Sequence, residues 1–210
     1  MRLPTQFERT FALVVLLGMT VIAASVAMTR STLQSAIEKD ATLIAQSWAD
    51  YIVRTVPDIE AIAEGKKPSA ESSRILGLSK EVGTVFRYKI FSRDGTMALV
   101  SDDSEFSMSK YEDLHDHSAL AADVVATGRP FVEVKEGSGY HRPPYYGEAY
   151  VPLVRDGRTL ATVEVYVDLT EHREAMETAF RTLLLKVLGG LAVAFAIPAG
   201  AYALLSREKA

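Results

Sequence analysis

The longest uncharged runs of the chain lie near its two ends. Residues 10–29 read TFALVVLLGMTVIAASVAMT and residues 187–206 read VLGGLAVAFAIPAGAYALLS, each with a basic residue on either side. At about 1.5 Å of rise per residue, either run forms a helix about 30 Å long, which matches the hydrocarbon thickness of a bilayer. The pattern therefore predicts two transmembrane helices, at residues 10–29 and 183–206.

A cleaved leader is the alternative interpretation of the first run. Ser25-Val26-Ala27 has the small residues of a cleavage site. However, the apolar stretch exceeds the 7–15 residues that are usual in a signal peptide, and a helical pattern continues beyond it. This favours an uncleaved anchor over a secreted, soluble protein.

The basic residues beside the two runs predict the orientation. Arg2 and Arg9 precede the first run, and Arg207 and Lys209 follow the second. The positive-inside rule then places segments 1–9 and 207–210 in the cytoplasm. We expect a multi-pass protein of the cytoplasmic (inner) membrane, with residues 30–182 forming a periplasmic domain.

A helical period continues directly from the first run into the outer domain. Its apolar positions recur three, four or seven residues apart on one face, which predicts an amphipathic helix that Pro57 interrupts. They are Leu33, Ile37, Ala41, Ile44, Trp48 and Ile52. Short helical pieces are expected through Ile62 and, after a loop at residues 65–69, through Leu78.

From residue 85 the apolar period changes to two, which indicates β-strands. Asp94-Gly95 and Asp156-Gly157 each predict a tight hairpin turn. A polar excursion at residues 102–117 and a helix at 119–126, ended by Gly128, separate the strands. The expected strands are residues 85–91, 97–101, 131–135, 146–154 and 159–168. This order predicts an α+β fold, with a long N-terminal helix and one five-stranded antiparallel sheet.

The two hairpins resemble those of the extracytoplasmic Cache (PAS-like) sensor domains of bacterial membrane-bound signalling proteins. The resemblance lies in FRYKIFSRDG at residues 86–95 with Ser101-Asp102, in GEAYVPL at 147–153 and in VEVYVD at 163–168. It implies a helix along one face of the sheet, a small-ligand pocket on the other face and a homodimer. It also implies a cytoplasmic output, of the diguanylate cyclase/phosphodiesterase or histidine kinase type. Because only a short stub follows the second run, we expect this output in a longer form or in another polypeptide.

Alternation along the strands selects the candidate ligand-binding residues. Side chains two positions apart share a face of a strand. On the first strand this puts Phe86, Tyr88 and Ile90 opposite the basic residues. The resulting set of tyrosines, acids and bases is Arg87, Lys89, Tyr146, Glu148, Tyr150, Glu164 and Tyr166. Such a set favours a small polar ligand, or else a solvated face with cross-strand ion pairs. Whether Arg87 and Glu148 share a face is open at this point.

Composition and missing motifs exclude several classes of function. The net charge is −4 and no basic stripe is present, so we expect no nucleic-acid partner. The chain has no cysteine, which excludes disulfides and thiol catalysis. No nucleophile elbow, phosphate-binding loop or HExxH motif occurs, so we predict no enzymatic activity in this chain and no cofactor.

Three loop clusters have weaker interpretations. A histidine cluster could ligate a metal or respond to pH, an acidic cluster could bind a cation, and a tyrosine cluster could form a lid. Ordinary surface loops explain the first two better, so we predict no metal site. The clusters are His115, Asp116, His117 and His141; Asp102, Asp103 and Glu105; and Tyr140, Tyr145 and Tyr146.

The combined expectation is a membrane-anchored sensor that binds a small ligand and signals through its transmembrane helices. Small residues at four-residue spacing in the second run, namely Ala192, Ala196 and Gly200, would let helices approach closely. The alternative is a structural dimerisation module without ligand. A fully packed interior on the side of Tyr150 and Tyr166 would distinguish that module from a receptor.

Overall fold

A computed structural model describes residues 6–80, 83–101, 114–137 and 142–207. The chain divides into two units, Met1–Leu169 and Thr170–Ala210. The first unit holds all elements except the last helix. Its helices are α1 (Gln6–Thr55), α2 (Ile59–Ala63), α3 (Ala70–Leu78) and α4 (Leu114–Thr127). Its strands are β1 (Val85–Phe91), β2 (Met97–Val100), β3 (Phe131–Glu136), β4 (Tyr145–Arg155) and β5 (Arg158–Asp168).

Helix α1 is continuous from the apolar run into the folded domain. The part of α1 within the domain buries Ile37, Ala41, Trp48 and Ile52, four of the six periodic positions that the sequence predicted. The other two, Leu33 and Ile44, are only half-buried. The helix ends at Thr55, two residues before Pro57. A proline disfavours the helical conformation of the residue before it, so the predicted interruption is confirmed.

The five strands form one antiparallel sheet in the order β2-β1-β5-β4-β3. The hairpin of β4 and β5 turns at Asp156 and Gly157, which have φ of 51° and 75°. Two successive residues with positive φ suit the twist of a tight hairpin, which explains the Asp-Gly pair. The predicted α+β class and five-stranded sheet are confirmed.

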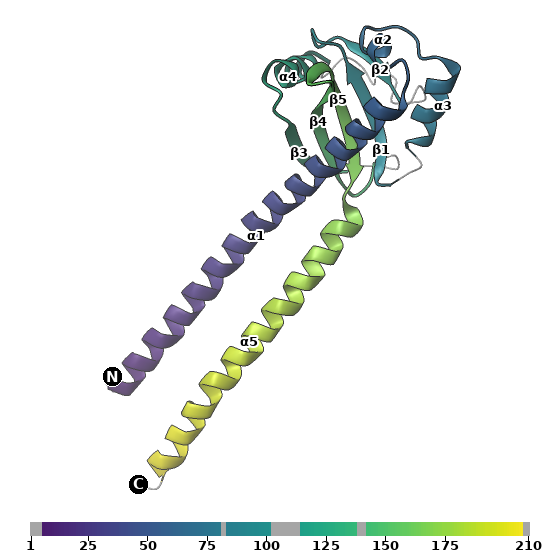
Figure 1. Cartoon of the computed structure of the whole chain (residues 1–210). Coiled ribbons are helices and arrows are strands. Elements are labelled where there is room, and N and C mark those ends of the chain that lie inside the picture. Colours follow the sequence, from purple (N-terminus) through teal and green to yellow (C-terminus); the bar gives the residue numbers. More distant parts are fainter. Residues whose placement is uncertain (1–5, 81–82, 102–113, 138–141, 208–210) are drawn as a thin grey trace. The chain divides into compact units, whose positions relative to one another are not determined.

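The two faces of the sheet are covered by different helices (Figure 1). Towards α1, the β5 residues Val163, Val165 and Val167 are fully buried. Gly147 on β4 lies so close to Ala41 of α1 that a Cβ atom built on it would be 3.0 Å from the Ala41 Cβ. This close approach lets a helix cross the middle of the sheet.

Helix α4 packs on the opposite face. The hydroxyl of Thr162 on β5 donates to the carbonyl oxygen of Ala121 at 2.8 Å. Ala121 and Val124 pack with Phe91 of β1 and Tyr150 of β4 in a buried cluster. Helix α4 thus covers one end of the face that carries the charged and tyrosine side chains, at Thr162 and Tyr150.

A β-bulge corrects one prediction about the first strand. Val85 pairs with Val167 and Arg87 with Tyr166, so Phe86 is the extra residue and the register shifts there. Its ring makes edge contacts with Tyr146 and Tyr166, at centroid distances of 6.1 and 6.0 Å. Phe86 therefore lies with Arg87, not opposite it, because a bulge breaks the alternation of side chains.

Some element ends also differ from the predicted ones. Helix α4 begins at Leu114, within the segment that we expected to be irregular, and β4 and β5 meet directly at their turn. Polar residues start α4, and their short-range pattern alone does not distinguish a helix from a loop.

The second unit is a single helix, α5 (Thr170–Arg207). Its first turns are polar and include an ion pair between Arg173 and Glu177 at 2.7 Å. Further along, Leu183, Val193 and Ile197 are exposed. Within the described residues, two helical segments are long and apolar enough to cross a membrane, Leu16–Thr55 and Thr170–Ile197.

Two glycine-to-alanine substitutions test the packing of α1 on the sheet. Gly147→Ala places a methyl group about 3 Å from Ala41 and Leu169, so we expect a loss of about 1–3 kcal/mol from overpacking. Gly77→Ala, in α3, meets no atom within 4 Å and should stabilise by up to about 1 kcal/mol. Urea unfolding measures the change in the free energy of unfolding for both variants. An unchanged stability of Gly147→Ala would contradict the close approach of α1 to β4.

Candidate functional site

The cross-strand register places all seven predicted ligand-binding residues on one face of the sheet. Arg87 lies opposite Tyr166, and Tyr166 lies opposite Glu148, so these three stand side by side across β1, β5 and β4. One row further, Lys89, Glu164 and Tyr150 are aligned in the same way. Arg87 and Glu148 therefore do share a face, which the sequence left open.

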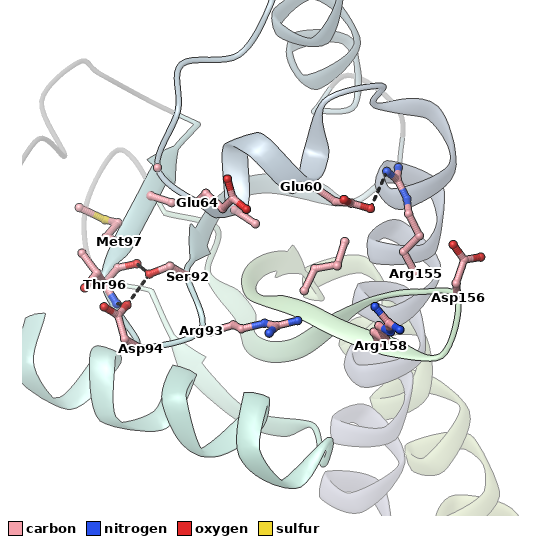
Figure 2. A pocket seen from close by; sticks show the side chains of 14 residues that line it. Glu60, Glu64, Ser92, Arg93, Asp94, Thr96, Met97, Arg155, Asp156 and Arg158 are labelled. Atoms are coloured by element: carbon pink, nitrogen blue, oxygen red, sulfur yellow. Dashed lines mark hydrogen bonds and ion pairs between the residues drawn. The ribbon is translucent and has the colours of Figure 1, made fainter.

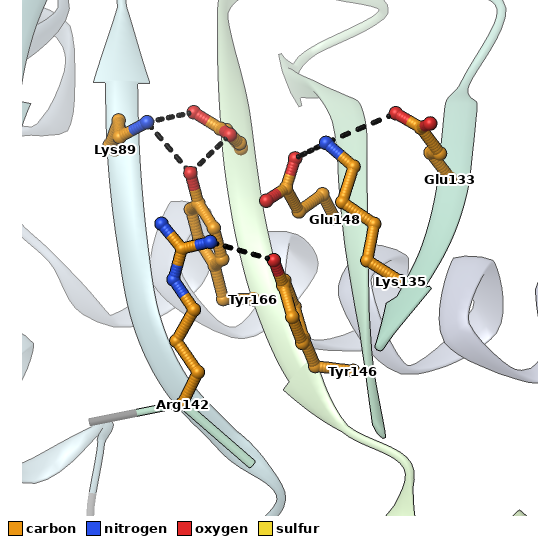
Figure 3. A network of polar contacts seen from close by, with 8 residues as sticks. Lys89, Glu133, Lys135, Arg142, Tyr146, Glu148 and Tyr166 are labelled. Atoms are coloured by element: carbon orange, nitrogen blue, oxygen red, sulfur yellow. Dashed lines mark hydrogen bonds and ion pairs between the residues drawn. The ribbon is translucent and has the colours of Figure 1, made fainter. Parts of the chain in front are cut away.

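The centre of this face is a buried ionic cluster. Lys89 Nζ lies 2.9 Å from Glu164 Oε2 and donates to the hydroxyl of Tyr166 at 2.7 Å. That hydroxyl in turn donates to Glu164 Oε1 at 2.6 Å. The side chains of Lys89 and Glu164 are only 11% and 0% exposed. Figure 3 shows the contact between Lys89 and Tyr166 in this cluster.

A second ionic group follows on the outer strands. Lys135 of β3 donates to Glu148 Oε2 at 2.7 Å and lies 3.2 Å from Glu133 Oε2. Burial acts to lower the pKa of Lys135, but the hydrogen bond and charge of Glu148, together with Glu133, raise it overall. Because Lys135 and Glu133 are partly exposed, this group lies where solvent and solutes reach it.

Aromatic rings connect the two groups. Tyr146 stacks on Tyr166 with a centroid distance of 6.4 Å, and the guanidinium of Arg87 lies over the Tyr166 ring at 5.4 Å. Arg142, from the segment before β4, donates to the hydroxyl of Tyr146 at 3.1 Å (Figure 3). The ring face attracts such a cation, which helps to fix the position of the guanidinium group.

Burial keeps the tyrosines of the site neutral. It is the main cause that raises the pKa of Tyr150 and of Tyr166, and the charge of Glu164 adds to it. The pKa of Tyr146 is raised by burial and by the charge of Glu148, with Arg142 acting in the opposite direction. Tyrosine hydroxyls are protonated at neutral pH in any case, and the raised pKa values extend this state to more alkaline pH.

The site combines buried side chains that contact one another with more exposed charged side chains around them. Lys89, Glu164, Tyr150 and Tyr166 are buried and hold one another, so they position neighbouring side chains. Lys135, Glu133 and Arg142 are more exposed and supply both signs of charge. Such a surface can recognise a small molecule with a carboxylate, an ammonium group or both.

The sequence missed four residues of this face: Phe86, Glu133, Lys135 and Arg142. Glu133 and Lys135 alternate with apolar residues on β3, and pairing that strand with β4 would have placed them opposite Glu148 and Tyr146. The bulge that turns Phe86 and the fold that brings Arg142 to Tyr146 have no local sequence pattern.

The loop clusters lie largely outside the described residues. This holds for Asp102, Asp103 and Glu105, for Tyr140 and His141, and for the side chains of His115 and His117. Of the tyrosine cluster, Tyr145 and Tyr146 are in β4 and buried. In the part of the chain that the structure describes, no three His, Asp or Glu side chains are grouped to hold a metal ion.

Comparison with known proteins gives structural similarities only. No family model and no curated protein sequence matches the chain. The ligand-binding domain of the Campylobacter jejuni chemoreceptor Tlp3 in complex with L-valine is similar with a TM-score of 0.34 and 16% identity, over 71% of this chain and 66% of that one. The Tlp3 sensory domain with isoleucine gives the same values, and its complex with 4-methylisoleucine gives 0.29 and 13%, over 71% and 65%. The chain thus spans just under two thirds of these ligand-binding sensory domains.

Removing the buried carboxylate tests the ionic cluster. Glu164→Ala leaves Lys89 without its buried counter-charge, and we expect a loss of about 3–5 kcal/mol. Glu133→Ala removes a half-exposed partner of Lys135 and should cost about 0.5 kcal/mol or less. Chemical denaturation compares the two variants, and the double variant Lys89→Met/Glu164→Leu should recover most of the loss. Equal effects of the two single variants would contradict the cluster.

The raised pKa of Tyr88, a buried tyrosine of β1, predicts that the free energy of unfolding falls at alkaline pH. Burial raises the pKa of Tyr88 from 10.0 to about 12, so the folded state holds its proton longer than the unfolded chain. This contribution is complete below pH 10 and declines from about pH 10 to 12, by about 1.4 kcal/mol per pH unit. Tyr88→Phe should remove that part of the slope in unfolding measured between pH 8 and 12, whereas Tyr51→Phe, at an exposed position, should leave it unchanged.

Proposed function

We propose that this chain is a membrane-anchored sensor of the Cache (PAS-like) kind, whose charged sheet face binds a small ligand. The observation that carries the proposal is the location of the seven predicted residues on one face, around the Lys89–Glu164–Tyr166 cluster. A purely structural sheet would fill this face with apolar side chains, since buried ion pairs contribute little net stability.

The ligand that fits these groups is a small carboxylate or an amino acid. Arg87 and Arg142 lie over tyrosine rings, at 5.4 and 5.8 Å from the ring centroids, and both are suited to bind a carboxylate. Glu148 and Glu133 lie beside Lys135 and suit an ammonium group. The buried cluster holds these groups in place, so that less entropy is lost on binding.

At both ends the domain continues directly into a predicted membrane helix, and the signal passes through these two connections. Helix α1 runs without a break from the sheet into the apolar run, and only Leu169 separates β5 from α5. A shift of β5 or α1 on binding would thus act directly on the membrane helices of a homodimer and on a cytoplasmic output. The ligand shifts the equilibrium between the two signalling states only by its difference in affinity for them. A difference in binding free energy of about 1.4 kcal/mol changes the ratio of the two states tenfold.

A structural dimerisation module is the second candidate function. One observation favours it: an apolar groove of about 500 Å³ runs along α1 beside Leu43, Trp48 and Tyr51 and reaches the start of β1. Leu43 and Tyr51 are exposed there. A second copy of the chain would cover these side chains, and in a module without a ligand this contact would be the whole function.

Ligand screening of the full chain in lipid nanodiscs tests the sensor function. We expect a carboxylate or amino acid from a metabolite panel to raise Tm and to change the fluorescence of Trp48, the only tryptophan. Arg87→Gln and Arg142→Gln should each weaken that binding at least tenfold, because both arginines are proposed to bind its carboxylate. Arg129→Gln, an exposed arginine between α4 and β3, is the matched control and should bind normally.

Results of two kinds would contradict the proposal, one on ligand binding and the other on the membrane anchor. The first is a full panel without any thermal or fluorescence response, which would leave the dimerisation module. The second is release of the intact chain from membranes by carbonate washing, or an N-terminus near Met28 by sequencing. Either would remove the membrane anchor.

A further inference from the structure

The first residue of β4, Tyr145, contacts both segments that lead into the predicted membrane helices. Its hydroxyl donates to the Oε1 atom of Gln34 on α1 at 3.2 Å. Its carbonyl oxygen accepts the backbone N–H of Leu169, the residue before α5, at 3.0 Å. The Gln34 amide is oriented for this contact, because its Nε2 atom donates to Glu38 at 2.9 Å. Tyr145, which the sequence placed in a loop cluster, therefore joins the start of the domain to its end.

The last residue of β4, Arg155, holds the other end of α1. Its Nη2 atom donates to the carbonyl oxygens of Val53 at 2.6 Å and of Val56 at 3.4 Å. Its Nη1 atom lies 3.3 Å from Glu60 of α2, and Figure 2 shows this contact. The last carbonyl groups of a helix have no partner within the helix. Arg155 therefore supplies hydrogen bonds that the end of α1 needs.

These two contacts have nearly the same spacing on the helix and on the strand. From Gln34 to Val53, α1 rises about 28 Å at 1.5 Å per residue, and the ten steps of β4 span about 33 Å. Between the two ends, a Cβ atom built on Gly147 would lie 3.0 Å from the Ala41 Cβ. The helix and the strand thus run alongside each other, with hydrogen bonds at both ends and close packing between them.

Hydrogen bonds at two separate points do what apolar packing does not. The hydrophobic effect is non-directional, so packing of α1 on small residues and valines opposes separation of helix and sheet more than sliding between them. Hydrogen bonds depend on distance and angle. One such contact fixes a single point of the helix, whereas two contacts about 28 Å apart fix both its axial position and its direction.

We propose that Tyr145 and Arg155 are positioning residues that hold α1 on β4, so that the helix follows any displacement of this strand as one rigid unit. The same strand carries Tyr146, Glu148 and Tyr150 on the charged face. A ligand that contacts these side chains thus acts on α1 without a change inside the helix. This role in signalling rests on the proposed sensor function, whereas the rigid connection is a property of the domain itself.

Pulsed EPR on the full chain in nanodiscs tests the connection. The chain has no cysteine, so Ser35→Cys on α1 and Val154→Cys on β4 give unique spin-label sites at exposed positions. The labels lie about 30 Å apart along the strand, and their distance reports sliding of α1 on β4. We expect Tyr145→Phe and Arg155→Gln each to widen the distance distribution about twofold, because each removes hydrogen bonds that oppose sliding. The double variant should give the widest distribution.

Matched variants separate this role from a loss of stability. Tyr51→Phe and Arg54→Gln make the same changes at exposed positions of α1 and should leave the width unchanged. Tyr88→Phe removes a buried hydroxyl that donates to the Leu76 carbonyl oxygen at 3.5 Å. It should lower stability without widening the distribution.

Two outcomes would overturn the proposal. They are an unchanged width in the double variant, and equal widening by Tyr88→Phe. No ligand is added in this experiment, so its result is independent of the metabolite panel. A panel without response would leave the rigid connection standing, and normal ligand binding with unchanged widths would remove the connection alone.

Discussion

A carboxylate with no exposure to water needs a counter-charge and hydrogen bonds, and Glu164 obtains both from its neighbours. It lies on β5, which is flanked by β1 and β4, so both sides of the strand are paired. Lys89 supplies the charge, and the Tyr166 hydroxyl connects the two. Burial of an unpaired charge would cost several kcal/mol. The register that brings Lys89 opposite Glu164 is therefore the condition on which this face of the sheet depends.

The same register gives the two faces different tasks. The α1 face is lined with valines and small residues, and it fixes a long helix across the sheet through the approach of Ala41 to Gly147. The other face carries the charges and tyrosines, and α4 covers part of it. A slip of one residue would exchange the two sets of side chains. The polar surface and the surface that contacts α1 thus both depend on the same register between the strands.

The hairpin of β4 and β5 connects the charged sheet face to the end of α1. Its body carries Glu148, Tyr150 and Glu164 on the sheet face, and Arg155 lies at its turn. Arg155 also holds the end of α1. Rigid elements of this kind transmit small displacements, because packed side chains have few alternative arrangements. The hairpin is the element through which a ligand on the sheet face would act on the helices.

The elements of this fold were readable from the sequence. The apolar runs, the helical period up to Pro57, the alternation of the strands and the Asp-Gly turns are local patterns, since each depends on neighbours within a few residues. They also allowed the choice of seven polar side chains that the structure places on one face. Ligand binding by these residues stays a prediction.

What only the tertiary structure decided is which distant segments meet. The pairing of β1 with β5 joins the first and last strands, and it alone brings Lys89 to Glu164. The bulge at Phe86 and the place of Lys135 and Arg142 also depend on such pairings. Local periodicity carries no information on register between strands far apart in the chain, because that register is selected by the packing of the whole sheet.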